Sequence, residues 1–220
     1  MRLLSLLFPD RCPYCGQIIS GKAFECEVCR SEIISLRLEM TIPSGNRCIA
    51  PFSYEGKVRN AILEYKFSSI KFNAESLARR LAEVLSDIAQ DTDIVCWVPV
   101  SKKRRRERGF DQSELLAVKT ARLLGINCAC LLKKIKNNET QHRLDKEQRA
   151  ANVKNVYAAA KPELIKDKRI LLVDDICTTG NTLAECCRVL YSAGARSVLC
   201  AAAAITPTPD KKRNDNDDII

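Results

Sequence analysis

Unbroken apolar runs alternate with helical stripes along most of the chain. The runs at residues 93–98, 170–173 and 197–205 are typical of parallel strands that are buried on both faces. Apolar residues recur at helical spacing from Val58 to Tyr65 and from Leu77 to Ile88. Strands that alternate with helices predict an α/β fold, a Rossmann-like parallel sheet flanked by helices.

Two weaker runs and one capped helix complete this pattern. Residues 49–54 and 129–132 are interpreted as further strands. Asp111 and Glu114 have the spacing of a capping box, so a helix is expected to begin there and to end near Gly125.

The run at 170–173 passes at once into polar residues. Asp174 and Asp175 stand at its carboxyl end, and a bend rich in hydroxyl groups leads to a helical pattern that opens at Leu183. A strand, a tight turn and a helix amino terminus form an anion site, because free amides and the positive helix end converge there. We therefore expect a phosphate on the bend, with these binding residues: Cys177, Thr178, Thr179, Gly180, Asn181 and Thr182.

The acidic pair narrows the choice of phosphate compound. Carboxylates accept hydrogen bonds from hydroxyl groups and help to hold a divalent cation, so a ribose 5-phosphate would suit both the bend and the pair. The alternative is a strand end with acidic residues and no ligand, which is common in α/β folds. The order V-D-D-x-x-T-T-G-x-T is much rarer and favours a ligand.

This run closely resembles the phosphoribosyl pyrophosphate (PRPP) loop of type I phosphoribosyltransferases. The resemblance implies that Asp174 and Asp175 are the catalytic residues and bind the ribose hydroxyls. It also implies that residues 177–182 wrap the 5-phosphate and that Mg²⁺ accompanies PRPP. The acceptor of the phosphoribosyl group is not indicated by any stretch of the sequence.

A strongly basic segment follows the run at 93–98. In an open α/β sheet, a loop at this position lies on the same edge as the acidic pair. Phosphoribosyltransferases carry their pyrophosphate loop there, so the resemblance assigns Ser101 and Lys102 to the pyrophosphate. The cations that follow are interpreted as a nucleic-acid rim, with a solvated charge run as the alternative: Lys103, Arg104, Arg105, Arg106 and Arg108.

The amino-terminal region carries two CxxC knuckles separated by ten residues, formed by Cys12, Cys15, Cys26 and Cys29. Four thiolates suit tetrahedral zinc. Residues 1–38 are fewer than the ~40 that commonly fold without a staple, which favours a structural zinc module over the alternative of a redox CxxC. Most other cysteines have apolar neighbours and are expected to be small buried hydrophobes.

Composition agrees with a soluble protein of one ordinary domain plus this appendage. The 220 residues are 46% apolar and 29% charged, and no apolar run approaches the ~20 residues that a membrane helix needs. Residues 1–8 lack the features of a secretory signal, so we expect a cytoplasmic protein without an integral membrane segment. The excess of 36 basic over 27 acidic residues, a net charge of +9, favours anionic partners.

The cysteine knuckles, the PRPP loop and the run RGFDQ at 108–112 together resemble the ComF family of competence proteins. The resemblance extends to about residue 205 and includes Gln141, Leu144, Arg149 and Asn152. It implies a zinc-binding module at 1–38, a phosphoribosyltransferase-like domain at 47–205 and a tail at 206–220, whose composition is typical of disorder.

The ComF resemblance implies a PRPP-binding protein that handles incoming single-stranded DNA in natural competence. The implied partners are PRPP or another ribose 5-phosphate compound, single-stranded DNA, the competence helicase and other DNA-processing proteins. The alternative is an active phosphoribosyltransferase of nucleotide salvage or synthesis with no DNA role. Two further points stay open: Phe110 either stacks on a base or packs in the core, and His142 in the polar segment 133–152 is either an acid–base group or a solvated residue of a lid.

Overall fold

The long apolar runs form the centre of a six-stranded sheet in this computed structural model, which describes residues 9–19, 23–67, 73–136 and 155–207. The strands of the sheet are β1 (Leu38–Thr41), β2 (Arg47–Ala50), β3 (Phe52–Ser53), β4 (Ile94–Trp97), β7 (Arg169–Cys177) and β8 (Ser197–Ile205). β7 lies between β4 and β8, and both pairings are parallel. β8 also pairs in parallel with β2 and β3, and β1 closes the edge antiparallel to β2. The predicted parallel sheet is confirmed.

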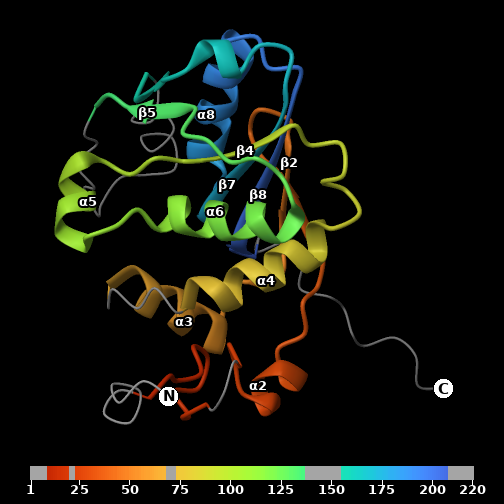
Figure 1. Cartoon of the computed structure of the whole chain (residues 1–220), viewed down its shortest axis with the longest axis vertical. Coiled ribbons are helices and arrows are strands. Elements are labelled where there is room, and N and C mark those ends of the chain that lie inside the picture. Colours follow the sequence, from red (N-terminus) through yellow and green to blue (C-terminus); the bar gives the residue numbers. More distant parts are fainter. Residues whose placement is uncertain (1–8, 20–22, 68–72, 137–154, 208–220) are drawn as a thin grey trace.

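Helices cover both faces of this sheet (Figure 1). The helices within the described residues are α2 (Glu27–Glu32), α3 (Gly56–Phe67), α4 (Asn73–Leu85), α5 (Lys102–Arg108), α6 (Gln112–Leu124) and α8 (Asn181–Ser192), with a 3₁₀ turn at Pro162–Leu164. Of these, α2 lies in the amino-terminal module, away from the sheet (Figure 1). α4 and α6 bury Leu81 and Leu116 in one core against the face of β7 that carries Leu171. α8 buries Leu190 against the opposite face, which carries Leu172. Alternating residues of one strand thus serve two cores, as expected for its unbroken apolar run at residues 170–173.

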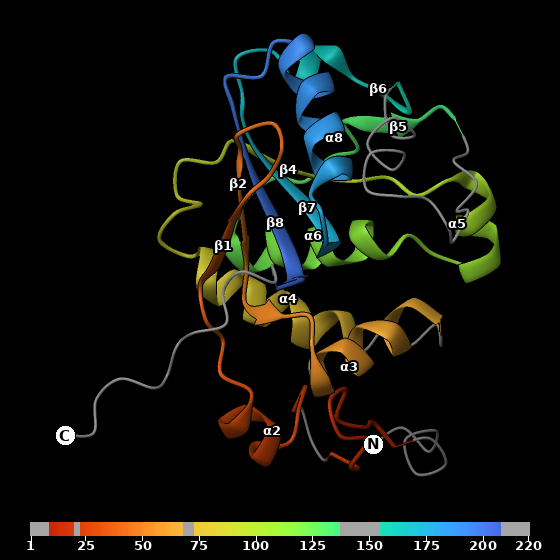
Figure 2. The same ribbon diagram turned by 180° about the vertical axis from the view of Figure 1, so that it is seen from behind.

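The amino-terminal module packs against the outer side of α3 and α4, below the sheet in Figure 2. The hydroxyl of Ser76 on α4 donates a hydrogen bond of 3.2 Å to the hydroxyl of Tyr14, and the ring of Tyr14 meets Phe52 edge to face, with 6.2 Å between centroids. Arg80 on α4 forms an ion pair of 3.0 Å with Glu25, and both side chains are less than one-fifth exposed. The module therefore extends the core of the main domain.

The basic segment after β4 is a helix, so the prediction of a loop there is wrong. The Oγ of Ser101 caps α5 by accepting a hydrogen bond of 3.2 Å from the backbone N–H of Arg104. Lysine and arginine have high helix propensity, and one good cap offsets the mutual repulsion of exposed charges in so short a helix. Gly109 ends α5 in the left-handed conformation, and Asp111 then caps α6 as predicted.

The strand that was predicted at 129–132 lies further along the chain. β5 (Leu132–Lys134) pairs antiparallel with β6 (Tyr157–Ala159) in a small second sheet. Cys128 makes only an isolated bridge to Val95, and residues 129–131 belong to no strand. A second difference is β1, a strand that the sequence pattern did not predict. Its alternating burial follows from its place at the sheet edge.

Some predictions lie outside the described residues. These are most of the lid at 133–152, including His142 and the ComF-type residues 141, 144, 149 and 152, and the tail beyond residue 207. Within the described ranges, no helix is both long and apolar enough to cross a membrane.

Gly180 lets the loop after β7 approach the hairpin between β1 and β2. Its φ is +73°, and a Cβ built on it would lie 2.6 Å from Cγ2 and 2.7 Å from Cβ of Ile42. Gly109 has nearly the same φ, +76°, but a Cβ there would meet nothing within 4 Å. The two glycines therefore share a conformation and differ in packing.

We expect Gly180→Ala to lower the free energy of unfolding more than Gly109→Ala does. Each change forces alanine into the left-handed region, at about 1–2 kcal/mol. Only Gly180→Ala adds the overpacking against Ile42, about 1–3 kcal/mol more. Urea unfolding followed by circular dichroism measures both values, and equal losses would show that the contact with Ile42 relaxes freely.

Candidate active site and metal centre

Two neighbouring carboxylates occupy the carboxyl end of β7. The Oδ1 of Asp174 accepts hydrogen bonds from the Oγ of Ser113 at 2.9 Å and from the backbone N–H of Asp175 at 2.8 Å. The Oδ2 of Asp175 lies 3.0 Å from the Nζ of Lys66, and these two side chains are 17% and 19% exposed. Both acids lie inside β7, which is longer than the strand predicted at residues 170–173, so they do not follow the strand as the sequence indicated. The ladder of β7 with β8 pairs Asp174 with Ala202 and so fixes the backbone at the first of the two acids.

The surroundings of Asp174 resist a negative charge. Burial raises the pKa of Asp174 to about 7, and the neighbouring charge of Asp175 acts in the same direction. The hydrogen bonds from the Asp175 amide and from Ser113, together with the positive charge of Lys66, only partly offset this rise. A bound cation or hydrogen-bond donor would stabilise the charged form of this carboxyl and lower its pKa again. Such perturbed pKa values are common at functional sites.

The bend after β7 encloses a cavity of about 30 Å³, lined by Asp174 and by residues 176–183. In the described part of the chain, the backbone amides of residues 178–182 donate to no backbone acceptor. The bend leads directly into α8, whose amino terminus adds a partial positive charge. All six predicted phosphate residues, 177–182, line this cavity together with one of the two predicted catalytic acids.

The side chain of Cys177 does not face a ligand. It is 1% exposed and lies in the core beside Cys48, and this contact together with burial raises the pKa of the Cys48 thiol. Only the main chain of Cys177 can contribute to the cavity.

The residues assigned to the pyrophosphate start α5. Ser101 is 9% exposed, and its hydroxyl oxygen already serves as the helix cap, whereas Lys102 is exposed in the first turn. The backbone N–H of Val100 donates to the Oδ2 of Asp111 at 2.9 Å, so the loop before α5 is anchored to the start of α6.

The predicted rim residues divide into two groups. Arg105 forms an ion pair of 3.1 Å with Glu114, and Arg108 donates to the Oε1 of Gln112 at 3.0 Å, so these two brace α6. Lys103 and Arg106 are exposed, and Arg104 is half-buried. Figure 1 shows α5 at the side of the molecule, projecting beyond the sheet.

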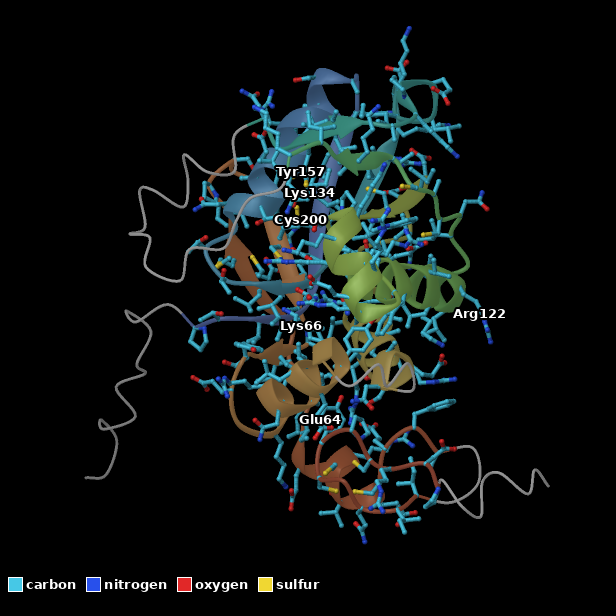
Figure 3. All side chains as sticks on the ribbon, turned by 90° about the vertical axis from the view of Figure 1, so that its left-hand side faces the viewer. Glu64, Lys66, Arg122, Lys134, Tyr157 and Cys200 are labelled. Carbon is cyan, nitrogen blue, oxygen red and sulfur yellow. The ribbon has the colours of Figure 1, made fainter. Side chains whose placement is uncertain are left out.

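Sequence reasoning missed three residues at or near the site: Ser113, Lys66 and Tyr157. Ser113 and Lys66 hold the two acids. In the sequence, Ser113 lies within the predicted capping box, and Lys66 directly follows the apolar helical stripe that ends at Tyr65, so neither residue stands out by itself. Lys134 and Tyr157, labelled together in Figure 3, come from the small sheet, and the Lys134 ammonium lies 5.5 Å from the ring centroid of Tyr157. Burial and the positive charge of Arg104 lower the pKa of Lys134, while Asp174 opposes that shift.

Phe110 belongs to the core. Its side chain is 9% exposed, and its ring lies 5.8 Å from that of Tyr65. The stacking alternative for Phe110 is therefore wrong.

The four cysteines of the amino-terminal module converge on one point. The sulfur atoms of Cys12, Cys15, Cys26 and Cys29 all lie within 4.8 Å of one another. Cys15 and Cys26, from different knuckles, approach to 3.6 Å, close to the roughly 3.8 Å that a tetrahedral zinc with Zn–S bonds of about 2.3 Å requires. A redox pair would instead join two sulfurs of one knuckle. The arrangement fits four thiolate ligands and a structural zinc ion.

Replacing one ligand tests the metal centre. We expect Cys26→Ser to reduce bound zinc from about one ion per chain to none, because three thiolates bind zinc far more weakly than four. Cys130→Ser is the matched control, since Cys130 is exposed and lies outside the cluster. Mass spectrometry of metal content after gel filtration gives the result, and full zinc occupancy in Cys26→Ser would contradict the assignment.

Comparisons with known proteins agree with this geometry. A family model for the double zinc ribbon domain matches residues 3–59, and one for the phosphoribosyl transferase domain matches residues 111–220. DNA utilization protein YhgH of Salmonella typhimurium is 28% identical over 195 residues, covering 85% of this chain and 80% of that protein. Competence protein ComFC of Bacillus subtilis is 29% identical over 187 residues, covering 83% and 72%.

Solved structures give more distant likenesses. Glutamine PRPP amidotransferase from B. subtilis has a TM-score of 0.45 and 22% identity, over 64% of this chain and 30% of that one. Because the transferase model covers half of its residues, the chain belongs to the phosphoribosyl transferase domain family, here joined to a double zinc ribbon as the resemblance to the ComF family predicted.

Proposed function

We propose that the protein binds PRPP at the carboxyl end of β7 and uses it as a phosphoribosyl donor. The observation that carries this proposal is the shared cavity, in which Asp174 lies beside the amides of residues 178–182. An anion-binding bend and a diol-binding carboxylate within one small cavity match the two ends of a ribose 5-phosphate.

The roles of the residues follow from their chemistry. The 5-phosphate would accept hydrogen bonds from the amides of residues 178–182, and Asp174 and Asp175 would accept them from the ribose hydroxyls. The pyrophosphate would lie toward Ser101 and Lys102. The carboxylates also suit Mg²⁺, which would neutralise part of the pyrophosphate charge when it is bound.

In the transfer, the bond between the ribose C1 and the pyrophosphate oxygen breaks as the acceptor forms a new bond to C1. Positive charge develops on the ribose, and the carboxylates of Asp174 and Asp175 would stabilise it. Their partial burial strengthens this effect, because a charge in a poorly solvated site interacts more strongly than one in water.

We further propose a cytoplasmic role in natural competence or DNA uptake, in which the protein handles incoming single-stranded DNA together with the competence helicase and other DNA-processing proteins. The names of the relatives, DNA utilization protein and competence protein, support this role. So do the exposed cations of α5, Lys103 and Arg106. Within this proposal, residues 1–38 form the zinc-binding module and residues 47–205 the transferase-like domain.

The second candidate is a phosphoribosyltransferase of nucleotide salvage or synthesis without a DNA role. The small sheet of β5 and β6 favours it, since Lys134 and Tyr157 place polar groups in the electrostatic field of Asp174. Such groups could orient a small acceptor.

Titration calorimetry with Mg²⁺ and PRPP at several pH values tests the first step. Binding needs the Asp174 carboxylate, whose pKa is raised to about 7 in the free protein, so a proton must leave below that pH. We expect affinity to be highest above pH 7 and to fall by up to about tenfold per pH unit below it. Asp174→Asn should bind at least about tenfold more weakly and lose this pH dependence.

Asp91→Asn is the control for the loss of one acidic side chain, since the Asp91 side chain is 90% exposed. It should bind like the wild type. If the wild type binds no PRPP, or if Asp174→Asn binds it equally well, the proposal is wrong.

A salt series of gel shifts with single-stranded DNA separates the two candidates. Removing Lys103 and Arg106 together should lower the slope of log affinity against log salt by about 1.4, or roughly 0.7 per cation. Arg122→Ala removes a charge from the last turn of α6, whereas α5 lies before the first turn of α6 in the chain, and it should leave the slope unchanged. A wild-type protein that binds no single-stranded DNA would favour the second candidate.

A further inference from the structure

The ammonium of Lys66 occupies one of the two carboxylates that the proposed function assigns to ribose. Its Nζ lies 3.0 Å from the Oδ2 of Asp175, and fewer than one-fifth of either side chain is exposed. In Figure 3, Lys66 lies on the side of α3 that faces the sheet, whereas Glu64 lies toward the amino-terminal module. Asp175 therefore cannot offer that oxygen to a ligand unless Lys66 shares it or moves.

The end of α3 is fixed in a way that brings Lys66 to this place. The hydroxyl of Tyr65 donates to the backbone carbonyl of Gln112 at 2.6 Å, and the Nε2 of Gln112 donates to the carbonyl of Lys66 at 3.4 Å. Gln112 is fully buried, and its Oε1 accepts from Arg108 on the basic helix α5. One buried amide thus ties the backbone of Lys66 to the helix where the pyrophosphate is expected.

Among the residues that the structure describes, a single ion pair holds the Lys66 side chain. A lysine ammonium has three donors on a flexible stem, so it can exchange one anionic partner for another without movement of the helix. A ligand that brings several negative charges beside the ribose would compete with Asp175 for this ammonium. A ligand with no group at C1 beyond a hydroxyl would not.

We propose that Lys66 is a pyrophosphate-binding residue that pairs with Asp175 in the free protein and transfers to the pyrophosphate when PRPP binds. This inference rests on the proposed function and extends it. Lys66 would make the site selective for PRPP over ribose 5-phosphate, because only PRPP supplies a second anion in exchange for the lost ion pair. The exchange also releases both Asp175 oxygens to the ribose hydroxyls.

The test compares the affinities of full-length protein for PRPP and for ribose 5-phosphate, each with Mg²⁺, by titration calorimetry. We expect Lys66→Met to weaken PRPP binding by about tenfold to a hundredfold, the loss typical of one charge-assisted hydrogen bond. Ribose 5-phosphate should bind with unchanged or higher affinity, since Asp175 is no longer occupied. Lys66→Arg keeps the charge and should retain most of the preference for PRPP. If Lys66→Met does not fold, Lys66→Arg is the variant to compare with the wild type.

Lys57→Met is the matched control. Lys57 lies on the same helix in an exposed ion pair with Glu32, and its loss should change neither affinity. If Lys66→Met weakens the binding of both ligands equally, Lys66 only supports Asp175. If it weakens neither, Lys66 plays no part in binding. Either result overturns the inference about Lys66 but leaves the proposed function standing. If the wild type binds neither ligand, the proposed function fails as well, so the two failures are distinguishable.

Discussion

The structure depends on keeping two carboxylates close together at the end of a buried strand. Charged groups that are partly withdrawn from water are costly, and two like charges are more costly still. The protein offsets this cost with specific partners: Ser113 and a backbone amide for Asp174, and Lys66 for Asp175. These partners are too few to bring the pKa of Asp174 back to its ordinary range. The site is therefore prepared for a ligand that supplies further positive charge or hydrogen-bond donors.

The elements around β7 are arranged so that these partners arrive from different parts of the chain. α6 brings Ser113 and is capped by Asp111, while Gln112 between them holds the end of α3. The amino-terminal module packs on α4 through Tyr14 and the buried pair of Arg80 with Glu25, and its Glu32 pairs with Lys57 on α3. A module that has no residue in the cavity thus supports the helix pair that delivers Lys66. This arrangement gives a physical reason for a zinc ribbon in a phosphoribosyl transferase domain protein.

Local signals in the sequence predict the part of the site that is itself local. The apolar run, the acid pair and the hydroxyl-rich bend are contiguous, so their order alone indicates a strand, a bend and a helix. The four cysteines are also two local pairs, and only their convergence requires the fold. Lys66 and Ser113 reach the acids through contacts across more than 60 residues, and nothing in their own neighbourhood indicates those contacts. The basic run is a helix rather than the expected loop, and it carries no apolar stripe that predicts one, because none of its seven residues is buried.

The central claim is that the acid pair and the bend bind one ligand together. The most direct measurement is a titration with ribose 5-phosphate and Mg²⁺ followed by ¹⁵N–¹H nuclear magnetic resonance, with Asp174→Asn/Asp175→Asn in parallel. The account predicts that the amide signals of residues 178–182 shift together in the wild type, with one dissociation constant that is weakened in the double variant. Amides that do not shift, or that shift with the same dissociation constant in both proteins, would contradict it.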